Sequence, residues 1–146
     1  PIYRRFLWFF GLLLQTKIVH QLFGAKIGRG TILGNAVMMT PDRITLGDNC
    51  NIGIGGIITG HMYEDKTLYL KSVKIGNTVT VGGYAIIFAG AEIGDNVRIG
   101  AKTVVPKDRV IPPKTIWVRG KCIPRKDLEW NEEEERALVG RVNNDE

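Results

Sequence analysis

The sequence is poor in the residues from which metal centres and disulfide frameworks are built. Its 146 residues include two cysteines, Cys50 and Cys122, and two histidines, His20 and His61. Two cysteines so far apart match neither a disulfide framework nor a metal-ligand spacing, and a zinc site with three histidine ligands cannot form within a chain that has two. We therefore expect no metal and a reducing, cytoplasmic compartment, with Cys50 as a buried structural thiol and His20 as a structural or solvated residue.

The sequence also lacks a long apolar run. The longest unbroken one, residues 6–14, falls well short of the roughly 18 residues that cross a bilayer, and no small-residue signal-peptide cleavage site accompanies it. We expect residues 1–23 to form an apolar helix that caps the rest of the fold, lies at a membrane interface, or ends a preceding membrane segment. The chain starts with Pro1 rather than Met, which we interpret as a processed product or a fragment of a longer protein.

Proline is scarce (6 residues) but glycine is abundant (18), and the formal net charge is +5. Much glycine with little proline indicates a chain with many tight corners. A basic chain suits nucleic acid, a membrane surface or a phosphorylated cofactor, as well as ordinary solubility. The basic residues are not interleaved with stacking aromatic residues, which argues against nucleic acid.

The dominant feature of the chain is that every sixth residue between positions 75 and 123 is apolar. With 44% hydrophobic residues, such a series has a chance of about one in a thousand. Neither a helix nor a lone strand has this period, so the pattern indicates a repeat of short strands and tight corners. Three strands would close one coil, and coils would stack at about 4.8 Å. The apolar positions are Ile75, Val81, Ile87, Ile93, Ile99, Val105, Ile111, Trp117 and Ile123, and small or β-branched residues expected to point inward are Val79, Ala85, Ala91, Val97, Thr103 and Thr115.

The repeats begin at Ile27 and are interrupted twice. A slip at residues 44–46 indicates a corner insertion, and the step from Ile58 to Ile75 indicates a loop extruded over residues 61–71. Near the C-terminus, Asn131 followed by Glu134 is typical of a helix N-cap and predicts a short helix over about 132–139. We therefore divide the chain into residues 1–23, a repeat domain over 24–126 that carries the loop, and a C-terminal helix and tail over 127–146.

The stretch "IGNTVTVGGYAIIFAGAEIGDNVRIGAKTVVPKD" (residues 75–108) resembles the hexapeptide-repeat, left-handed β-helix acyltransferases, in particular the sugar and antibiotic O-acetyltransferases. The resemblance implies an all-β fold, a single-stranded left-handed parallel β-helix of about five coils. The left hand comes from the resemblance alone, because the usual rule for parallel crossovers favours the right hand. It also implies a homotrimer with sites between subunits, and a coenzyme A thioester such as acetyl-CoA as co-substrate.

In those enzymes the catalytic histidine stands at the start of the equivalent loop, and Thr59-Gly60-His61 matches that position. Acyl transfer from a thioester needs a base to take a proton from the attacking hydroxyl or amine, and histidine suits this role near neutral pH. We expect Glu64 and Asp65 to orient the imidazole. Backbone N–H groups of a corner such as Gly82-Gly83 would meet the oxyanion.

The same resemblance implies that basic residues near the C-terminal coils meet the phosphates of coenzyme A. Lys and Arg suit phosphate because they form charge-assisted hydrogen bonds with it. The chain departs from the family's usual Gly-Asn-Pro-Ala ending, having Gly120-Lys121-Cys122-Ile123-Pro124 instead. The matching stretch gives Ala101, Lys102 and Lys107, and the basic residues Arg119, Lys121, Arg125 and Lys126 follow it.

A second, looser resemblance covers more of the chain. The segments "GAKIGRG", "TPDRITLGDN" and "GHMYED" are similar to the C-terminal β-helix domains of membrane-linked peptide synthetases of the polylysine-synthetase type, which work on carrier-bound aminoacyl thioesters. Two alternatives to a coenzyme A-dependent enzyme thus remain: a domain that acts on carrier-bound thioesters, and a non-catalytic β-helix scaffold. Membrane contact through residues 1–23 is compatible with each.

Overall fold

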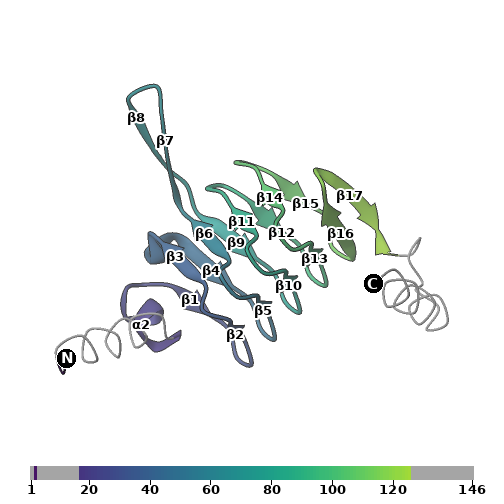
Figure 1. The fold of residues 1–146 in the computed structure, drawn as a ribbon, viewed down its shortest axis with the longest axis horizontal. Coiled ribbons are helices and arrows are strands. Elements are labelled where there is room, and N and C mark those ends of the chain that lie inside the picture. The colour runs from purple at the N-terminus through teal and green to yellow at the C-terminus, as the bar shows by residue number, and fades with distance from the viewer. Residues whose placement is uncertain (1, 3–16, 126–146) are drawn as a thin grey trace.

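The computed structural model describes residue 2 and residues 17–125. In this part the chain winds through three sheets in turn, so that each coil strand lies parallel beside the equivalent strand of the next coil; the last strand, β17, is antiparallel (Figure 1). The first sheet contains β1 (Lys26–Ile27), β4 (Ile44–Leu46), β9 (Val73–Ile75), β12 (Glu92–Ile93) and β15 (Val110–Ile111). The second contains β2 (Ile32–Leu33), β5 (Asn51–Ile52), β10 (Thr80–Val81), β13 (Arg98–Ile99), β16 (Thr115–Val118) and β17 (Lys121–Pro124), and the third contains β3 (Val37–Met39), β6 (Ile57–Thr59), β11 (Ile86–Ile87) and β14 (Val104–Val105).

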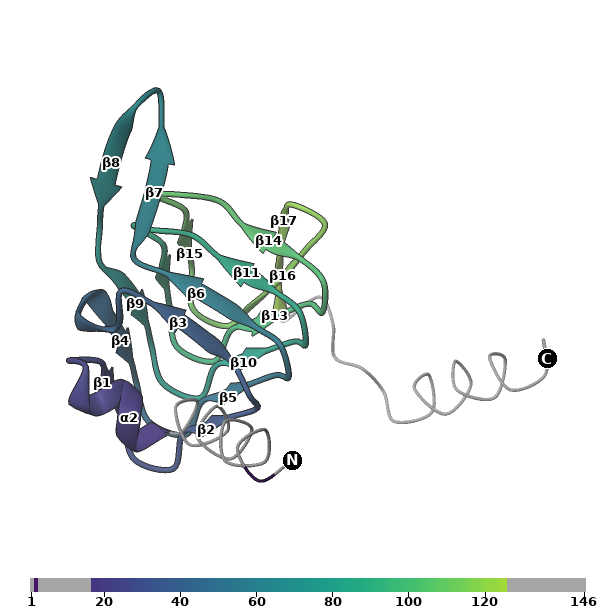
Figure 2. The same cartoon turned by 60° about the vertical axis from the view of Figure 1, so that its left-hand side comes forward.

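These sheets form a β-solenoid of about five coils, which confirms the predicted all-β coil architecture. The left hand of the coil stays a prediction. We call the turns from the first to the second sheet the first corner, from the second to the third the second corner, and from the third to the first the third corner (Figure 2).

The core is the column of inward side chains that the period of six predicted. In the second sheet Val81 pairs with Ile52 and Ile99, and all three side chains are buried. The small residues at the corners are also buried, as predicted, and Cys50 is among them at 1% exposure. A coil this narrow leaves room for little more than one apolar side chain per strand and one small one per corner, which explains the sequence pattern.

The corners turn through left-handed backbone conformations. Residues at this position have φ between 53° and 80° from Thr78 to Lys114, and they recur every sixth residue. They are Thr78, Tyr84, Gly90, Asn96, Lys102, Asp108 and Lys114. Most are not glycine, so the repeat glycines serve a different purpose, which is close approach of neighbouring coils.

Both ends of the solenoid are covered. At the N-terminal end, helix α2 (Lys17–Leu22) lies beside β1, with His20 buried and the Lys17 Nζ donating to the Gly28 carbonyl at 2.6 Å. The remainder of the predicted apolar helix, residues 3–16, lies outside the described residues, as does the predicted helix over 132–139. A covered end prevents the exposed strand edges from pairing with other chains.

At the C-terminal end the coil stops earlier than the sequence predicted. The expectation that the repeat continues to Ile123 is wrong, because the chain reverses at Arg119 and Gly120, both at positive φ, and β17 pairs antiparallel with β16. Ile123 lies opposite Ile116 instead of filling a further coil. The indole of Trp117 closes the core, and its Nε1 donates to the Val104 carbonyl at 3.0 Å.

Candidate functional site

Chemistry-bearing residues gather at the third corner, where strands of the third sheet end. Thr40 follows β3, Thr59 ends β6 and leads into His61, and Asp108 closes the corner after β14. Parallel pairing of β3 with β6 places Met39 beside Thr59, so residues 40 and 61, far apart in sequence, meet at the same edge.

The predicted loop over 61–71 is an antiparallel β-hairpin of β7 (His61–Glu64) and β8 (Thr67–Leu70) that projects from this corner (Figure 1). Its two-residue turn is Asp65-Lys66, with φ of 46° and 64°. Positive φ at both central residues is the mark of a type I′ turn, which usually takes Asn-Gly or Asp-Gly. Here Lys66 occupies the place of that glycine, so the sequence carries no hairpin signal, and the loop predicted from the break in the period is in fact a regular hairpin.

His61 is held at the root of the hairpin by two threonine hydroxyls. Its Nδ1 lies 2.6 Å from Thr40 Oγ1 and 3.3 Å from Thr59 Oγ1. Thr59 is buried, whereas Thr40 and His61 are partly exposed. Beside it, Gly60 packs closely against the preceding coil, where a Cβ on residue 60 would lie 2.9 Å from Arg43 Cβ.

The carboxylates predicted to orient the imidazole lie elsewhere on the hairpin. Glu64 forms an ion pair with Lys107, and this bond raises the pKa of Lys107. Asp65 is exposed at the hairpin tip. Among the residues the structure describes, hydroxyls rather than carboxylates therefore contact the His61 ring.

The hairpin is anchored to later coils through one of its faces. Lys71 pairs with Asp108 at 2.7 Å, and the Lys107 ammonium lies 5.8 Å from the centroid of the Tyr69 ring. These residues, with Met62, line a small cavity of about 120 Å³ between the hairpin and the third corner. Side chains alternate along a strand, so His61 and Tyr63 project from the opposite, open face of the hairpin.

The residues predicted to meet coenzyme A divide between two places. Gly82-Gly83, Ala101-Lys102 and Arg119 stack at the second corner, where Lys102 N donates to the Gly83 carbonyl at 2.9 Å. The Gly82 N–H donates to the Ile99 carbonyl at 2.8 Å and is not available to an oxyanion. Within one chain the width of the third sheet separates this corner from His61.

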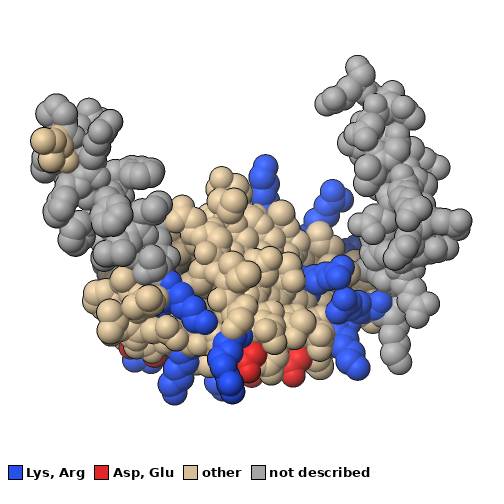
Figure 3. Space-filling view, turned by 90° about the horizontal axis from the view of Figure 1, so that it is seen from below, with Lys and Arg blue, Asp and Glu red and all other residues tan. Residues whose placement is uncertain are grey.

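Lys107 is the one predicted coenzyme A contact at the third corner, and it is paired with Glu64. Lys121 begins the closing strand β17 and Arg125 follows it, and Lys102, Arg119 and Lys121 are exposed. On the face shown in Figure 3, basic side chains gather over the C-terminal coils, at the right of the view. These exposed cations form a surface suited to phosphate groups.

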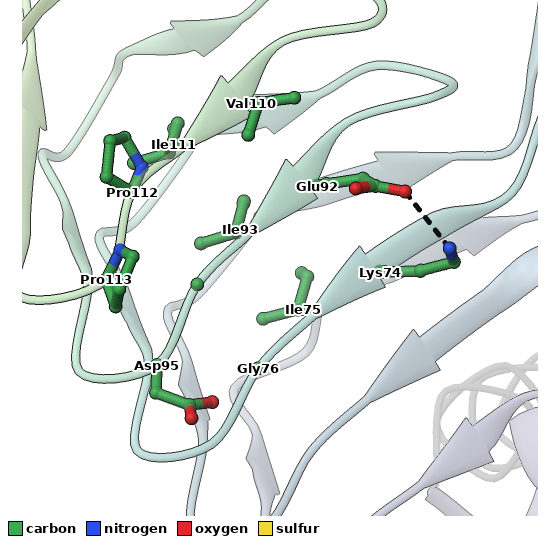
Figure 4. Close-up of a pocket in the computed structure, with 11 residues that line it drawn as sticks. Lys74, Ile75, Gly76, Glu92, Ile93, Asp95, Val110, Ile111, Pro112 and Pro113 are labelled. Carbon is green, nitrogen blue, oxygen red and sulfur yellow. Dashed lines mark hydrogen bonds and ion pairs between the residues drawn. The ribbon is translucent and has the colours of Figure 1, made fainter.

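A larger groove, of about 430 Å³, lies on the first sheet near the first corner (Figure 4). Its charged side chains are already engaged: Lys74 pairs with Glu92 at 3.0 Å, and Asp95 accepts a hydrogen bond from the Asn77 N–H at 2.6 Å. With Pro112 and Pro113 as one wall, the groove holds no group poised to move a proton. The third corner is therefore the better candidate for chemistry.

Within the described part of the chain, no three or more His, Cys, Asp and Glu side chains come together as a metal-ligand group. No helix of residues 17–125 is long and apolar enough to span a membrane.

The coils, their period of six and the hairpin at a corner define a hexapeptide-repeat β-solenoid. Residues 72–107 match the family model described as bacterial transferase hexapeptide (six repeats), so this stretch carries the hexapeptide repeat. This confirms the resemblance seen in the sequence.

The chain is similar to two curated proteins that differ in kind. It is 26% identical over 104 residues to delta-poly-L-ornithine synthetase of Acinetobacter baumannii, covering 71% of this chain and 8% of that protein. It is 34% identical over 89 residues to galactoside O-acetyltransferase of Escherichia coli, covering 56% of this chain and 43% of that protein. The chain thus spans less than half the length of either relative.

Among solved structures, a hexapeptide-repeat-containing acetyltransferase from Vibrio cholerae matches with a TM-score of 0.62 at 24% identity, covering 68% of this chain and 61% of that one. At this identity the likeness establishes the fold.

The sequence analysis missed Thr40 as a contact of His61. Thr40 lies one coil before His61, and no local sequence pattern marks it.

Proposed function

We propose that this chain is an acyltransferase that moves an acetyl or other acyl group from a coenzyme A thioester to a hydroxyl or amine acceptor. The observation that carries the proposal is the position of His61: partly exposed at the root of a hairpin that leaves the coil, with Nδ1 held by hydroxyls. The second ring nitrogen, Nε2, is then left for the acceptor. Similarity to a galactoside O-acetyltransferase supports the same class of reaction.

In the proposed reaction His61 acts as a general base. The acceptor O–H or N–H gives its proton to Nε2 as its oxygen or nitrogen attacks the thioester carbonyl carbon. The tetrahedral intermediate collapses with cleavage of the carbon–sulfur bond, and the proton passes from the imidazolium to the departing thiolate. The products are the acylated acceptor and free coenzyme A, with the histidine neutral again.

The cationic second corner and β17 supply the proposed contacts to the coenzyme A phosphates, through Lys102, Arg119, Lys121 and Arg125. Gly83 and Ala101 would line the path of the thioester arm. Glu64, proposed from sequence to orient the imidazole with Asp65, is engaged with Lys107, so we assign the Glu64–Lys107 ion pair the role of anchoring the hairpin.

A homotrimer would bring the two regions together. One column of outward side chains in the third sheet, paired in register from coil to coil, is β-branched and apolar: Val37, Ile57, Ile86 and Val104. The outward residues of the other two sheets include Lys, Glu, Arg, Asn and Thr. Burial of the third sheet against neighbouring subunits would set the His61 of one chain near the second corner of another.

The test is acyl transfer from acetyl-CoA to a panel of sugar, hydroxyl and amine acceptors, followed as release of free thiol. His61→Ala should lower kcat by about 10²–10⁴-fold, because it removes a positioned base. Acetyl-CoA affinity should change little, since the proposed phosphate contacts lie at another corner. Full turnover by His61→Ala would remove His61 from the mechanism.

A second candidate is a domain that transfers carrier-bound aminoacyl groups within a larger synthetase, favoured by the similarity to delta-poly-L-ornithine synthetase. The two candidates differ in the thioester donor. Rates with aminoacyl groups on a carrier protein should then exceed rates with acetyl-CoA. A non-catalytic scaffold would instead show neither turnover nor thermal stabilisation by any thioester.

We propose a cytoplasmic location with contact to membrane surfaces through residues 1–16, which are rich in apolar and aromatic residues. Flotation with anionic vesicles, comparing the chain with a variant that lacks residues 1–16 and keeps α2, tests this. Equal flotation of the two would contradict a membrane role.

A further inference from the structure

The hydrogen bonds around His61 restrict which ring nitrogen carries the proton. Thr59 Oγ1 lies 2.8 Å from the His61 carbonyl and 3.3 Å from His61 Nδ1. A hydroxyl has one hydrogen, and the shorter contact to the carbonyl takes it. Any hydrogen between Thr59 Oγ1 and Nδ1 therefore belongs to the imidazole, and Thr59 acts there as an acceptor.

Thr40 completes the arrangement from the preceding coil. It stands at the N-cap position of the short 3-10 helix η1 (Pro41–Arg43), where a threonine hydroxyl usually accepts a bond from the first turn. Here the hydroxyl makes no cap bond and lies 2.6 Å from His61 Nδ1 instead. Because Thr40 is partly exposed, its own hydrogen can go to solvent while its oxygen accepts from Nδ1–H.

The backbone of Thr40 supports a role beyond turning the corner. Its φ of 63° and ψ of 61° lie in the left-handed region, which costs a β-branched residue more than Gly or Asn. Asn serves this conformation at residues 35, 49 and 96. Thr78 occupies it too, at φ 56°, so the conformation alone is not the signal. The contact with His61 is what sets Thr40 apart.

We infer that Thr40 and Thr59 are positioning residues that hold His61 as the Nδ1–H tautomer, leaving the Nε2 lone pair directed to the acceptor. The inference rests on the proposed function for its catalytic meaning, but the tautomer itself is a property of the unliganded protein. The same logic applies wherever a base nitrogen must be unprotonated: the partner of the other nitrogen decides the tautomer.

The tautomer can be read directly from long-range ¹H–¹⁵N spectra of the imidazole rings at a pH where histidine is neutral. The chain has two histidines, so His61→Gln assigns the signals and His20 serves as an internal reference. We expect a protonated Nδ1 and an unprotonated Nε2 for His61 in the parent protein. Protonation at Nε2 instead would overturn the inference.

Matched variants separate the hydroxyl from the backbone. Thr40→Gly relieves the left-handed strain and removes the hydroxyl, whereas Thr78→Gly relieves left-handed strain at a corner away from His61. We expect Thr40→Gly and Thr40→Val to populate the Nε2–H tautomer and to lose about 10- to 100-fold in kcat with a small change in KM. Thr40→Ser and Thr78→Gly should keep the parent tautomer.

Two failures are distinguishable. If Thr40→Gly and Thr59→Val keep the parent spectrum, the threonines do not set the tautomer and the inference is wrong. If the tautomer shifts as expected while His61→Gln turns over normally, the placement of the hydroxyls is right and the proposed base is wrong.

Discussion

At the scale of single residues, the repeat glycines act by leaving room for the next coil. Most have ordinary negative φ, and the left-handed positions two residues later are held mainly by other residues. A Cβ on Gly82 would overlap the backbone nitrogen of Ala101 in the next coil. At Gly83 the nearest atom to a Cβ would be the Ile54 carbonyl oxygen, at 3.3 Å. Adjacent glycines thus differ in what they tolerate.

We expect Gly82→Ala to lower the free energy of unfolding by about 1–3 kcal/mol or more, because the overlap is with backbone that cannot rotate away. Gly83→Ala, its matched control, should cost under about 1 kcal/mol. Urea unfolding of both variants measures the difference. Equal losses would show that the corner, rather than the packing of coils, needs glycine.

A second residue-scale device is a ladder of side-chain oxygens along the first corner. Asp48, Asn77 and Asp95 each accept a hydrogen bond from a backbone N–H of the preceding coil, at 2.7, 2.9 and 2.6 Å. Gly76 makes room for one such oxygen, since a Cβ there would overlap Asp95 Oδ1. The ladder therefore explains both the Asx residues and the glycines at this corner.

Asp95→Ala removes one step of the ladder and should cost about 1 kcal/mol of unfolding free energy, the usual net value of one hydrogen bond. Asp95→Asn keeps the accepting oxygen, as Asn77 does naturally, and should cost much less. Thermal unfolding of the pair checks this. A large loss in Asp95→Asn would mean that charge matters more than the hydrogen bond.

At the scale of elements, helix α2 covers the first coil of the solenoid. Its packing there depends on His20 being neutral. The His20 side chain is 7% exposed, and burial lowers its pKa below the usual 6.5, partly offset by a hydrogen bond to the Ala36 backbone. A lowered pKa means that the unfolded chain takes up the proton first as pH falls. Acid should therefore loosen this end of the solenoid.

The lowered pKa of His20 predicts how the free energy of unfolding changes with pH. His20 is neutral in both states above its unfolded pKa, so its favourable burial is fully present there, and unfolding free energy falls as pH drops from about 6.5 toward the lowered pKa. His20→Gln should flatten the fall over this window relative to the parent. Unfolding at a series of pH values tests this, and parallel curves would contradict it.

The hairpin is the other element with a distinct role. It has exposed apolar side chains at Tyr63, Leu68 and Leu70 on the His61 face, and ion pairs on the other. A surface ion pair contributes little to the free energy of folding. The pairs Lys71–Asp108 and Glu64–Lys107 therefore mainly fix the orientation of the hairpin relative to the coils. This leaves the His61 face open to an acceptor or to a neighbouring subunit.

At the scale of the whole molecule, the outward apolar column of the third sheet is the surface best suited to self-association. Ile57 and Ile86 are partly exposed in the single chain, and Val104 is 47% exposed. A solenoid is too narrow to bury both faces of its sheets, so an apolar outer face needs a partner. This is the physical basis of the proposed trimer.

Ile86→Glu should convert the trimer to monomers at micromolar concentration, because it would place a charge at the centre of the buried face. Thr80→Glu puts the same charge on the outward face of the second sheet and should leave the assembly intact. Sedimentation of the two variants measures this. A monomeric parent protein would contradict both the proposed trimer and the proposed site between His61 of one chain and the second corner of another.

The period of six determined the main architecture by itself. An inward apolar residue at every sixth position, such as Val81 or Ile99, and a small one at each corner, such as Ala85, are enough to define stacked coils. The interruption after Thr59 likewise located the excursion, and the family resemblance then singled out His61 at its start. Both signals are local in sequence, and a repeat fold is encoded mainly by such local patterns.

Only the tertiary structure decided what meets across coils. Thr40 reaches His61 over a separation of 21 residues, and Lys107 reaches Glu64 over 43. Such contacts depend on register, which the corner at η1 and the hairpin reset in ways the period does not encode. The same holds for the end of the coil, where the period continues to Ile123 but the turn at Arg119-Gly120 folds the chain back so that β17 pairs antiparallel with β16.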